Sequence, residues 1–334
     1  MSSIYRPWLK RVLIAASIFA LTLTGPANSV SAQTMDWPNQ PIKILVGFPA
    51  GGASDVMARI IADELRKELK QPVVVENKPG AAGTLAASMT ARSKSDGYTL
   101  LLASPTAITL APSTMSDKIN YNPVTDLLPI SMVAKYPLFL IANPKLGVKN
   151  VSELIEMAKK EPGKINFASF GIFTSGGLAV EQLKLKAKIN VLHVPFNGSS
   201  AAMQGLLGGE VDLMFDTAVT ALPNIEAGKL VPLAIASKKK SSLAPKMPTV
   251  SETLPDFQAD SWVGLMAPAG TPAEVVSRIQ SAVAKIVATD VIKQRFSKLG
   301  AETESAETSD FVQHIKDETA RYEKLVHEAN IKLQ

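Results

Sequence analysis

The chain has 334 residues, 19% of them charged and none of them cysteine, and its formal net charge is +5. A chain without cysteine forms no disulfide, and thiol catalysis, cysteine-based metal sites and lipid attachment at a cysteine are excluded with it. A mature length of about 300 residues exceeds what one hydrophobic core usually holds, so two domains are expected.

The N-terminus predicts the compartment. Three basic residues within the first eleven precede the apolar stretch 12–23, and the small residues 30–32 suit a secretory peptidase. The apolar stretch is shorter than the roughly 20 residues that span a bilayer, so residues 1–32 are interpreted as a cleavable signal peptide. Their removal takes away three positive charges and no acidic ones, which lowers the formal charge from +5 to +2. We therefore expect a periplasmic protein that begins at Gln33 and binds no nucleic acid.

Short apolar runs alternate with amphipathic patterns along most of the chain, which predicts an α/β protein with parallel sheets. Strands are expected at 42–48, 72–76, 98–103, 137–142, 165–169, 190–195, 211–216, 231–236 and 261–267. Helices are expected at 53–70, 81–92, 151–160, 175–187, 199–207 and 217–227. The C-terminal third departs from this alternation, with long helices expected at 272–299 and 307–330.

A glycine loop joins the first strand to the first helix. Strand 42–48 runs into a Pro/Gly turn, and an amphipathic helix follows. Gly51 and Gly52 let the backbone approach a ligand, and the first helical N–H groups lack carbonyl partners, so an anion is favoured there. The spacing matches neither glycine-rich nucleotide motif. A plain βα turn with Ser54 or Asp55 as the helix cap is the alternative interpretation.

Other expected strands end in similar residues. Their loops, rich in glycine, hydroxyl or amide side chains, lie at 104–106, 170–177, 196–200 and 216–217. Ligands of open parallel sheets bind at the carboxyl ends of the strands, where these loops fall. The loops contain no Arg, Lys or His, so an anion there would be held by neutral donors and helix dipoles.

Five segments resemble successive signatures of one family: FPAGGASD at 48–55, VENKPGA at 75–81, DGYTLL at 96–101, HVPFNG at 193–198 and LLGGEVDLMFD at 206–216. The family is the Bug receptors, the extracytoplasmic solute-binding proteins of tripartite tricarboxylate transporters, and the match runs in order through essentially the whole mature chain. The resemblance implies a type II periplasmic-binding-protein (Venus flytrap) fold with two α/β domains and a ligand cleft between them. Residues 33–132 plus 256–334 would form domain 1, and residues 133–255 would form domain 2.

The resemblance also implies how the ligand is held. The loops that match 48–55 and 196–201 grip one carboxylate from both domains, with ordered water helping. The residues carried over as the grip are Phe48, Gly52, Ala53, Ser54, Phe196, Asn197 and Ala201, and the further contacts or water anchors are Ser104, Thr174, Ser175 and Asp216. The implied partners are a small carboxylate and the membrane permease subunits of the transporter, and the receptor is expected to be monomeric.

Two departures from the family bear on the ligand. The pair 196–197 is Phe-Asn where many members have Tyr and a basic residue, and 172–173 is Ile-Phe, with Leu178 nearby, where many have polar residues and a His. The distal pocket is therefore expected to be apolar, with Phe170 as a ligand-binding residue, which favours an aromatic mono- or dicarboxylate. An aliphatic di- or tricarboxylate is the alternative. Core packing is the other interpretation of Phe170 and Phe173.

An enzymatic function is not expected. No G-x-S-x-G motif is present, and His193 lies in an expected strand while His314 and His327 lie on the last expected helix, outside any H-E-x-x-H motif. No catalytic residue, cofactor or metal ligand is predicted. A ligand-sensing partner of a membrane histidine kinase remains an alternative function, and an extracytoplasmic hydrolase on a similar scaffold is a weaker one.

Overall fold

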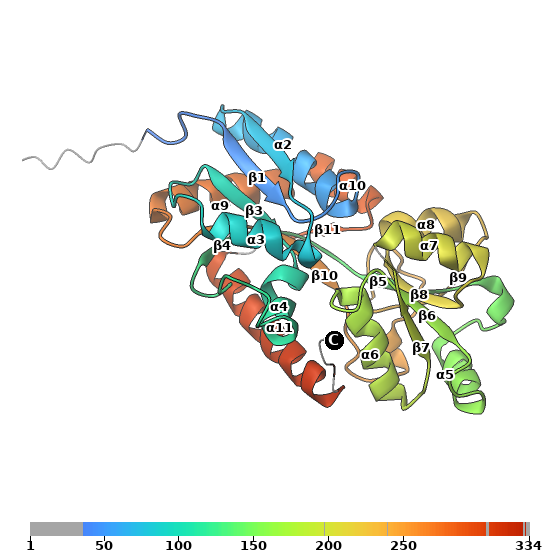
Figure 1. The fold of residues 1–334 in the computed structure, drawn as a ribbon. Helices are drawn as coiled ribbons and strands as arrows, with labels where there is room; N and C mark the ends of the chain where they lie inside the picture. The colour runs from blue at the N-terminus through green and yellow to red at the C-terminus, as the bar shows by residue number, and fades with distance from the viewer. Residues whose placement is uncertain (1–35, 197, 239, 305–306, 330, 332–334) are drawn as a thin grey trace, which may run out of the picture. The chain divides into compact units, whose positions relative to one another are not determined.

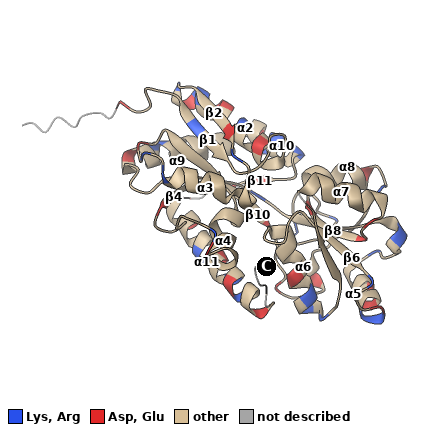
Figure 2. Cartoon of the chain, in the orientation of Figure 1, with Lys and Arg blue, Asp and Glu red and all other residues tan. Residues whose placement is uncertain are grey.

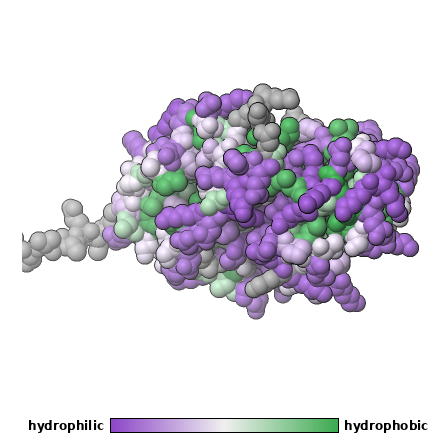
Figure 3. Space-filling view, turned by 90° about the horizontal axis from the view of Figure 1, so that it is seen from below, coloured by the Kyte–Doolittle hydropathy of each residue, from purple (hydrophilic) through white to green (hydrophobic). Residues whose placement is uncertain are grey.

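The computed structural model describes residues 36–196, 198–238, 240–304, 307–329 and 331. The chain divides into two compact units, residues 1–37 and 38–334, and the helices and strands of the described residues belong to the second. The expected signal peptide, residues 1–32, lies outside the described residues. Within the described part of the chain, no helix combines the length and apolarity needed to cross a bilayer. On the face drawn in Figure 3, hydrophilic residues predominate and hydrophobic residues form separate patches.

Sheet A has six strands among the described residues, in the order β11-β4-β10-β3-β1-β2 (Figure 1). Its strands are β1 (Ile42–Val46), β2 (Val73–Asn77), β3 (Thr99–Ala103), β4 (Leu127–Tyr136), β10 (Ser261–Pro268) and β11 (Glu302–Thr303). β1 is parallel to β2 and β3, whereas β10 is antiparallel to β3 and β4. The carboxyl ends of β1, β2 and β3 therefore share one edge of the sheet.

Sheet B has five strands among the described residues, in the order β7-β6-β8-β5-β9. They are β5 (Leu138–Ala142), β6 (Asn166–Ser169), β7 (Leu192–Pro195), β8 (Leu213–Thr217) and β9 (Val231–Ile235). β6 is parallel to β7 and β8, and β5 is antiparallel to β8 and β9. The carboxyl ends of β6, β7 and β8 share one edge, as in sheet A.

Helices follow the parallel strands and begin at these carboxyl edges. α2 follows β1, and α6, α7 and α8 follow β6, β7 and β8 (Figure 1). The α-helices of the described residues are α2 (Ala53–Leu69), α3 (Thr84–Ala91), α4 (Ala111–Thr114), α5 (Val151–Lys160), α6 (Ser175–Ala187), α7 (Ser199–Gly208), α8 (Ala218–Glu226), α9 (Ala273–Ala288), α10 (Asp290–Lys298) and α11 (Thr308–Glu328). Short helical turns include η1 (Ala81–Gly83) and the π-helix η2 (Thr106–Leu110).

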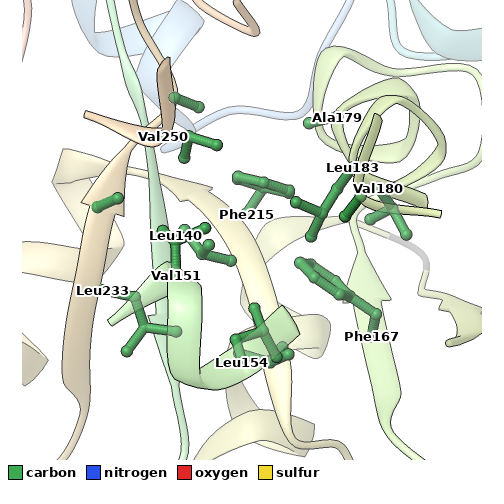
Figure 4. Packing of buried hydrophobic residues seen from close by; sticks show 14 of the residues in the cluster. Leu140, Val151, Leu154, Phe167, Ala179, Val180, Leu183, Phe215, Leu233 and Val250 are labelled. Atoms are coloured by element: carbon green, nitrogen blue, oxygen red, sulfur yellow. The ribbon is translucent and has the colours of Figure 1, made fainter. Parts of the chain in front are cut away.

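The two faces of sheet B carry separate hydrophobic clusters. Because side chains alternate along a strand, Leu140 of β5 faces a cluster with α5 and α6, and Phe139 and Ile141 face a cluster with α7 and α8. Figure 4 shows the first cluster, in which the rings of Phe167 and Phe215 stack with centroids 5.2 Å apart. These buried faces fix the strands whose carboxyl ends carry the candidate site.

The expected α/β fold with two sheets is found, but the expectation of parallel sheets is wrong, because both sheets are mixed. Strand β4 was not expected, and the single helix expected at 272–299 is two helices. Thr289 separates α9 from α10, and its hydroxyl accepts a hydrogen bond from the Ile292 N–H at 3.4 Å as the N-cap of α10. Hydrophobic alternation identifies a strand without giving its direction, so the antiparallel pairings had no signal in the pattern.

The chain passes between the sheets at two places. It leaves sheet A at Tyr136 and enters sheet B at Leu138, and it returns to sheet A at Ser261. These positions lie within about five residues of the predicted boundaries after 132 and 255, and the division into domains 33–132 plus 256–334 and 133–255 stays a prediction.

Candidate functional site

The predicted ligand residues lie at the carboxyl edges of the two sheets. Phe48, Gly52, Ala53 and Ser54 follow β1, and Ser104 follows β3, at the edge of sheet A. At or after the ends of β6, β7 and β8 in sheet B lie Phe170, Thr174, Ser175, Phe196, Ala201 and Asp216. Asn197 lies outside the described residues. The structure thus assembles two groups of candidate residues, one on each sheet.

The loop between β1 and α2 presents backbone N–H groups. Gly52 is the N-cap of α2, with φ −77° and ψ 167°, and no side chain caps the helix. The interpretation of Ser54 or Asp55 as the cap is therefore wrong. The N–H groups of a first helical turn have no intrahelical acceptor. Gly52 is exposed and Ala53 and Ser54 are half-buried, so these N–H groups lie at the surface of the loop.

A buried carboxylate holds this loop in place. Asp55 Oδ2 accepts from the Gly51 N–H at 2.9 Å, and Oδ1 accepts from Asn77 Nδ2 at 2.9 Å. Asn77 Nδ2 also donates to Phe48 O at 3.0 Å. Burial acts to raise the pKa of Asp55, but hydrogen bonds from Arg59 and its other partners outweigh burial and lower the pKa. The ionised carboxylate pairs with Arg59 at 2.9 Å, which offsets its charge beside the loop.

The loop between β6 and α6 is closed by a side-chain cap. Thr174 Oγ1 accepts from the Gly177 N–H at 3.2 Å and donates to Gly171 O at 2.7 Å. A Cβ on Gly177 would clash with backbone oxygens of the loop, so the loop lies directly on the first turn of α6. The half-buried Phe170 ring lies against Gly176, where a Cβ would meet Cε1 at 2.5 Å. Phe170 therefore contributes to core packing while bordering the loop.

Ser169, His193 and Glu181 form a hydrogen-bonded series next to the same loop. His193 Nδ1 lies 3.0 Å from Glu181 Oε1, and Nε2 lies 2.7 Å from Ser169 Oγ, which accepts from the Gly171 N–H at 3.3 Å. Burial acts to raise the pKa of Glu181, but hydrogen bonds from His193 and Lys184 lower it. The connectivity is that of a hydrolase triad, yet Ser169 is fully buried and offers no exposed nucleophile. The series instead ties β6, β7 and α6 to the loop backbone.

The loop between β7 and α7 sets an aromatic ring beside a helix start. The Phe196 N–H donates to Ser169 O at 2.8 Å, and the Phe196 ring lies against Gly205, where a Cβ would meet Cζ at 2.8 Å. Gly198 is the N-cap of α7 with φ 101°, a conformation that favours glycine. Ala201 is exposed on the first turn of α7. The start of α7 is therefore accessible next to a ring whose position is fixed.

Asp216, near the end of β8, joins the starts of α7 and α8. Its Oδ1 accepts from Ser199 Oγ at 2.7 Å and from the Thr217 N–H at 2.8 Å, and its Oδ2 accepts from Thr220 Oγ1 at 2.5 Å. The side chain is fully buried. Burial raises the pKa of Asp216 to about 6, against hydrogen bonds from Thr220, Ser199 and Thr217 that act to lower it. Both carboxylate oxygens are thus engaged by protein donors.

The helix starts of sheet B have few acidic residues, and the carboxylate of Asp216 at the starts of α7 and α8 is buried and held by protein donors. The first turns of α6, α7 and α8 contain no acidic residue. Basic residues of α5 and α6 lie in the last turns of those helices (Figure 2). A helix N-terminus carries partial positive charge and bare N–H donors, so several such ends at one sheet edge can bind a carboxylate or another anion. Among the described residues, no group of three or more His, Cys, Asp or Glu is placed to hold a metal ion.

Several residues that shape the site were not predicted. Arg59, Asn77, His193 and Glu181 support the loops without being ligand candidates in the sequence. Asn77 belongs to the segment VENKPGA that resembles the family, so the sequence could have indicated this residue. His193 was expected in a strand and without a catalytic role; its side chain is 10% exposed and hydrogen-bonded, which agrees with a structural role.

A comparison with protein families decides the assignment. The family model described as the tripartite tricarboxylate transporter family receptor matches residues 57–331. The chain belongs to this family. Protein BugT of Bordetella pertussis is 36% identical to the receptor over 327 residues, which cover 98% of this chain and 99% of BugT.

Two solved structures are similar to the receptor over most of its length. A protein of R. palustris, solved with adipate, is 30% identical with a TM-score of 0.83 and covers 89% of this chain and 99% of its own. MatC from Rhodopseudomonas palustris, solved with bound malate, is 32% identical with a TM-score of 0.78 and covers 87% of this chain and 100% of its own. The receptor is a solute-binding protein of the Bug type and not an enzyme. The expected family and the expected non-enzymatic function are therefore confirmed. Receptors of this type are periplasmic.

Proposed function

We propose that this chain captures a small carboxylate in the periplasm and delivers it to the permease subunits of a tripartite tricarboxylate transporter. The observation that carries the proposal is the gathering of helix N-termini at the carboxyl edges of both sheets. No side chain caps α2 or α7, and the first turns of α6, α7 and α8 contain no acidic residue. A carboxylate gripped by loops 48–55 and 196–201 would receive N–H donors from both domains. The precursor would lose residues 1–32 on export, and the receptor would act as a monomer.

The favoured ligand is an aromatic mono- or dicarboxylate. Phe48 and Phe173 are half-buried at the two sheet edges. Phe170 and Phe196 are also half-buried, with one part of each ring held against a helix glycine, so they would serve as rigid walls for a ligand ring. An aromatic pair adds roughly 0.5–1.5 kcal/mol beyond the buried area. Citrate among these rings would leave charges without partners.

An aliphatic dicarboxylate is the second candidate. The relatives solved with adipate and with malate support it, because both are similar to this chain over nearly its whole mature length. In that case the rings of Phe170 and Phe196 would only pack against Gly176 and Gly205 and would not contact the ligand.

A thermal-shift screen tests the proposal and separates the two candidates. The receptor is purified under denaturing conditions, refolded free of ligand, and heated with benzoate, phthalate, adipate, malate or citrate. A ligand that binds only the folded state stabilises it by about 2.7 kcal/mol at a hundredfold excess over Kd. We expect the aromatic acids to raise Tm most at equal concentration. A larger shift with adipate or malate would overturn the aromatic proposal, and no shift with any carboxylate would overturn the receptor proposal.

A further inference from the structure

The hydrogen bonds around Asp216 determine which hydroxyl protons remain available at the start of α7. Three donors converge on this carboxylate: the hydroxyls of Ser199 and Thr220 and the N–H of Thr217. Asp216 is fully buried, whereas Ser199 and Thr220 are half-buried. The two hydroxyl oxygens of these half-buried residues lie 3.4 Å apart, and Thr220 Oγ1 also lies 3.3 Å from Thr217 O.

A hydroxyl has one proton and two lone pairs, and an ionised carboxylate only accepts. Ser199 gives its proton to Asp216 Oδ1 at 2.7 Å, and Thr220 gives its proton to Oδ2 at 2.5 Å. Neither hydroxyl retains a proton for a ligand, so both oxygens offer lone pairs alone. A ligand carboxylate oxygen or ether oxygen meeting this pair would find no donor.

We propose that Ser199 and Thr220 form an acceptor pair, oriented by Asp216, which makes the receptor select a carboxylate that also carries a hydroxyl or amino group. The inference rests on the proposed function, and it adds a second requirement to the ligand. The helix N-termini bind the carboxylate, and the acceptor pair binds a hydrogen-bond donor elsewhere on the same molecule. Asp216 acts in this scheme as a positioning residue that touches no ligand.

The acceptor pair depends on the ionisation of Asp216. Burial raises its pKa to about 6, and the groups that act on it are the hydroxyls of Thr220 and Ser199 and the N–H of Thr217, with no charged side chain of the described residues contributing. Phe139 pairs with it from β5 and is apolar. A protonated Asp216 can donate to Thr220 Oγ1, whose own proton is then no longer held by the carboxylate and can pass to a ligand oxygen in competition with Thr217 O, which lies 3.3 Å away. Lowering the pH from 8 to 5 should therefore convert one acceptor into a donor.

Asp216→Asn makes the same change at any pH. The Thr217 N–H requires an acceptor at the position of Oδ1, so the amide oxygen takes that place and the amide NH₂ faces Thr220. The amide then donates to Thr220 Oγ1, and the Thr220 proton becomes available to a ligand oxygen in competition with Thr217 O at 3.3 Å. Asp216→Asn should therefore reduce the preference for a hydroxy acid over the matching ether. A general loosening of the loop would not change this preference.

The experiment compares matched ligands by calorimetry on the refolded receptor. Each of the three hydroxybenzoates is compared with benzoate and with its methyl ether, and malate is compared with succinate and 2-methoxysuccinate. At pH 8 we expect one hydroxy acid to bind at least tenfold more tightly than its parent acid, and the ether to bind no better than the parent. The ratio of hydroxy acid to ether affinity should fall about tenfold at pH 5, and by a similar factor at pH 8 in Asp216→Asn.

Hydroxyl-deletion variants complete the test. Ser199→Ala and Thr220→Val should each reduce the preference for the hydroxy acid, whereas Ser152→Ala, which removes an exposed hydroxyl from the first turn of α5, should leave it unchanged. If Asp216→Asn does not fold, the wild-type pH series supplies the same comparison. Carboxylates that bind with no preference for a donor group, or with a preference independent of pH, would overturn this inference while leaving the receptor function intact. Absence of all carboxylate binding would overturn the receptor function itself.

Discussion

Replacing Gly52 with valine is expected to weaken carboxylate binding at least a hundredfold while the protein stays folded. A hydrogen bond to a charged group contributes about 1.5–3 kcal/mol, and a valine side chain over the N–H groups of residues 52–54 would exclude the ligand from two or more of them. The fold has room for the change. A Cβ at Gly52 meets only Pro49 O, at an ordinary 3.5 Å, and its φ of −77° suits any residue.

Ser54→Ala is the matched comparison in the same loop. It removes a half-buried hydroxyl and keeps the backbone N–H, so a loss of tenfold or less is expected. Calorimetry on both variants with the strongest ligand of the screen gives the answer, and Tm checks that each is folded. Equal and small losses in the two variants would mean that the loop is a turn and not an anion grip.

The free energy of unfolding is expected to fall by about 3 kcal/mol as the pH rises through the range in which Glu318 ionises. Burial raises the pKa of Glu318 from 4.5 to about 7, although Arg321 and hydrogen bonds from Trp262 and Thr109 act to lower it. Between these pH values the folded chain binds a proton that the unfolded chain has lost, so stability decreases by about 1.4 kcal/mol for each step of one in pH. The full loss is present above pH 7 and absent below pH 4.5.

Glu318→Gln removes this contribution, so its unfolding free energy should fall about 3 kcal/mol less than that of the wild type between pH 4.5 and pH 8. The two proteins are compared by the slope of the unfolding free energy against pH and not by its absolute value. The absolute value also changes, because an amide accepts the hydrogen bonds from Trp262 and Thr109 less well than the native side chain does. Asp216 contributes in the same direction in both proteins and cancels. Glu323→Gln on the exposed face of α11 is the control and should follow the wild type. Urea titrations at four pH values measure the slopes, and equal slopes for wild type and Glu318→Gln would contradict the prediction.

The sequence carried clear signals for the strands that lead to the site. Strands were expected at 42–48 and 211–216, each followed by an expected helix. The structure has β1 (Ile42–Val46) and β8 (Leu213–Thr217) there, and a helix follows each strand at the carboxyl edge of its sheet. Such local patterns are sufficient because a strand, a turn and a helix start are each encoded within about ten residues. Strand β4 (Leu127–Tyr136) escaped prediction, and its antiparallel pairing with β10 joins residues far apart in the chain.

The interior of the candidate site was less predictable, because its contacts are also long-range. Asp55 and Asn77 are 22 residues apart, and Asp216 and Ser199 are 17 apart, and neither spacing belongs to a helix or strand period. Phe170 and Phe196 could be read from the sequence as aromatic residues in loops. Only the structure reveals that each ring lies against a glycine of the following helix, at Gly176 and Gly205.

The central claim is that a carboxylate charge is what the receptor recognises. The most direct test is calorimetry of the refolded, ligand-free receptor with the best acid of the screen and with the primary amide of that acid, which has the same shape and no charge. Helix N-termini attract the anion through their partial positive charge and bare N–H groups. We expect the acid to bind and the amide to bind at least a hundredfold more weakly. Equal affinities for acid and amide would contradict this claim.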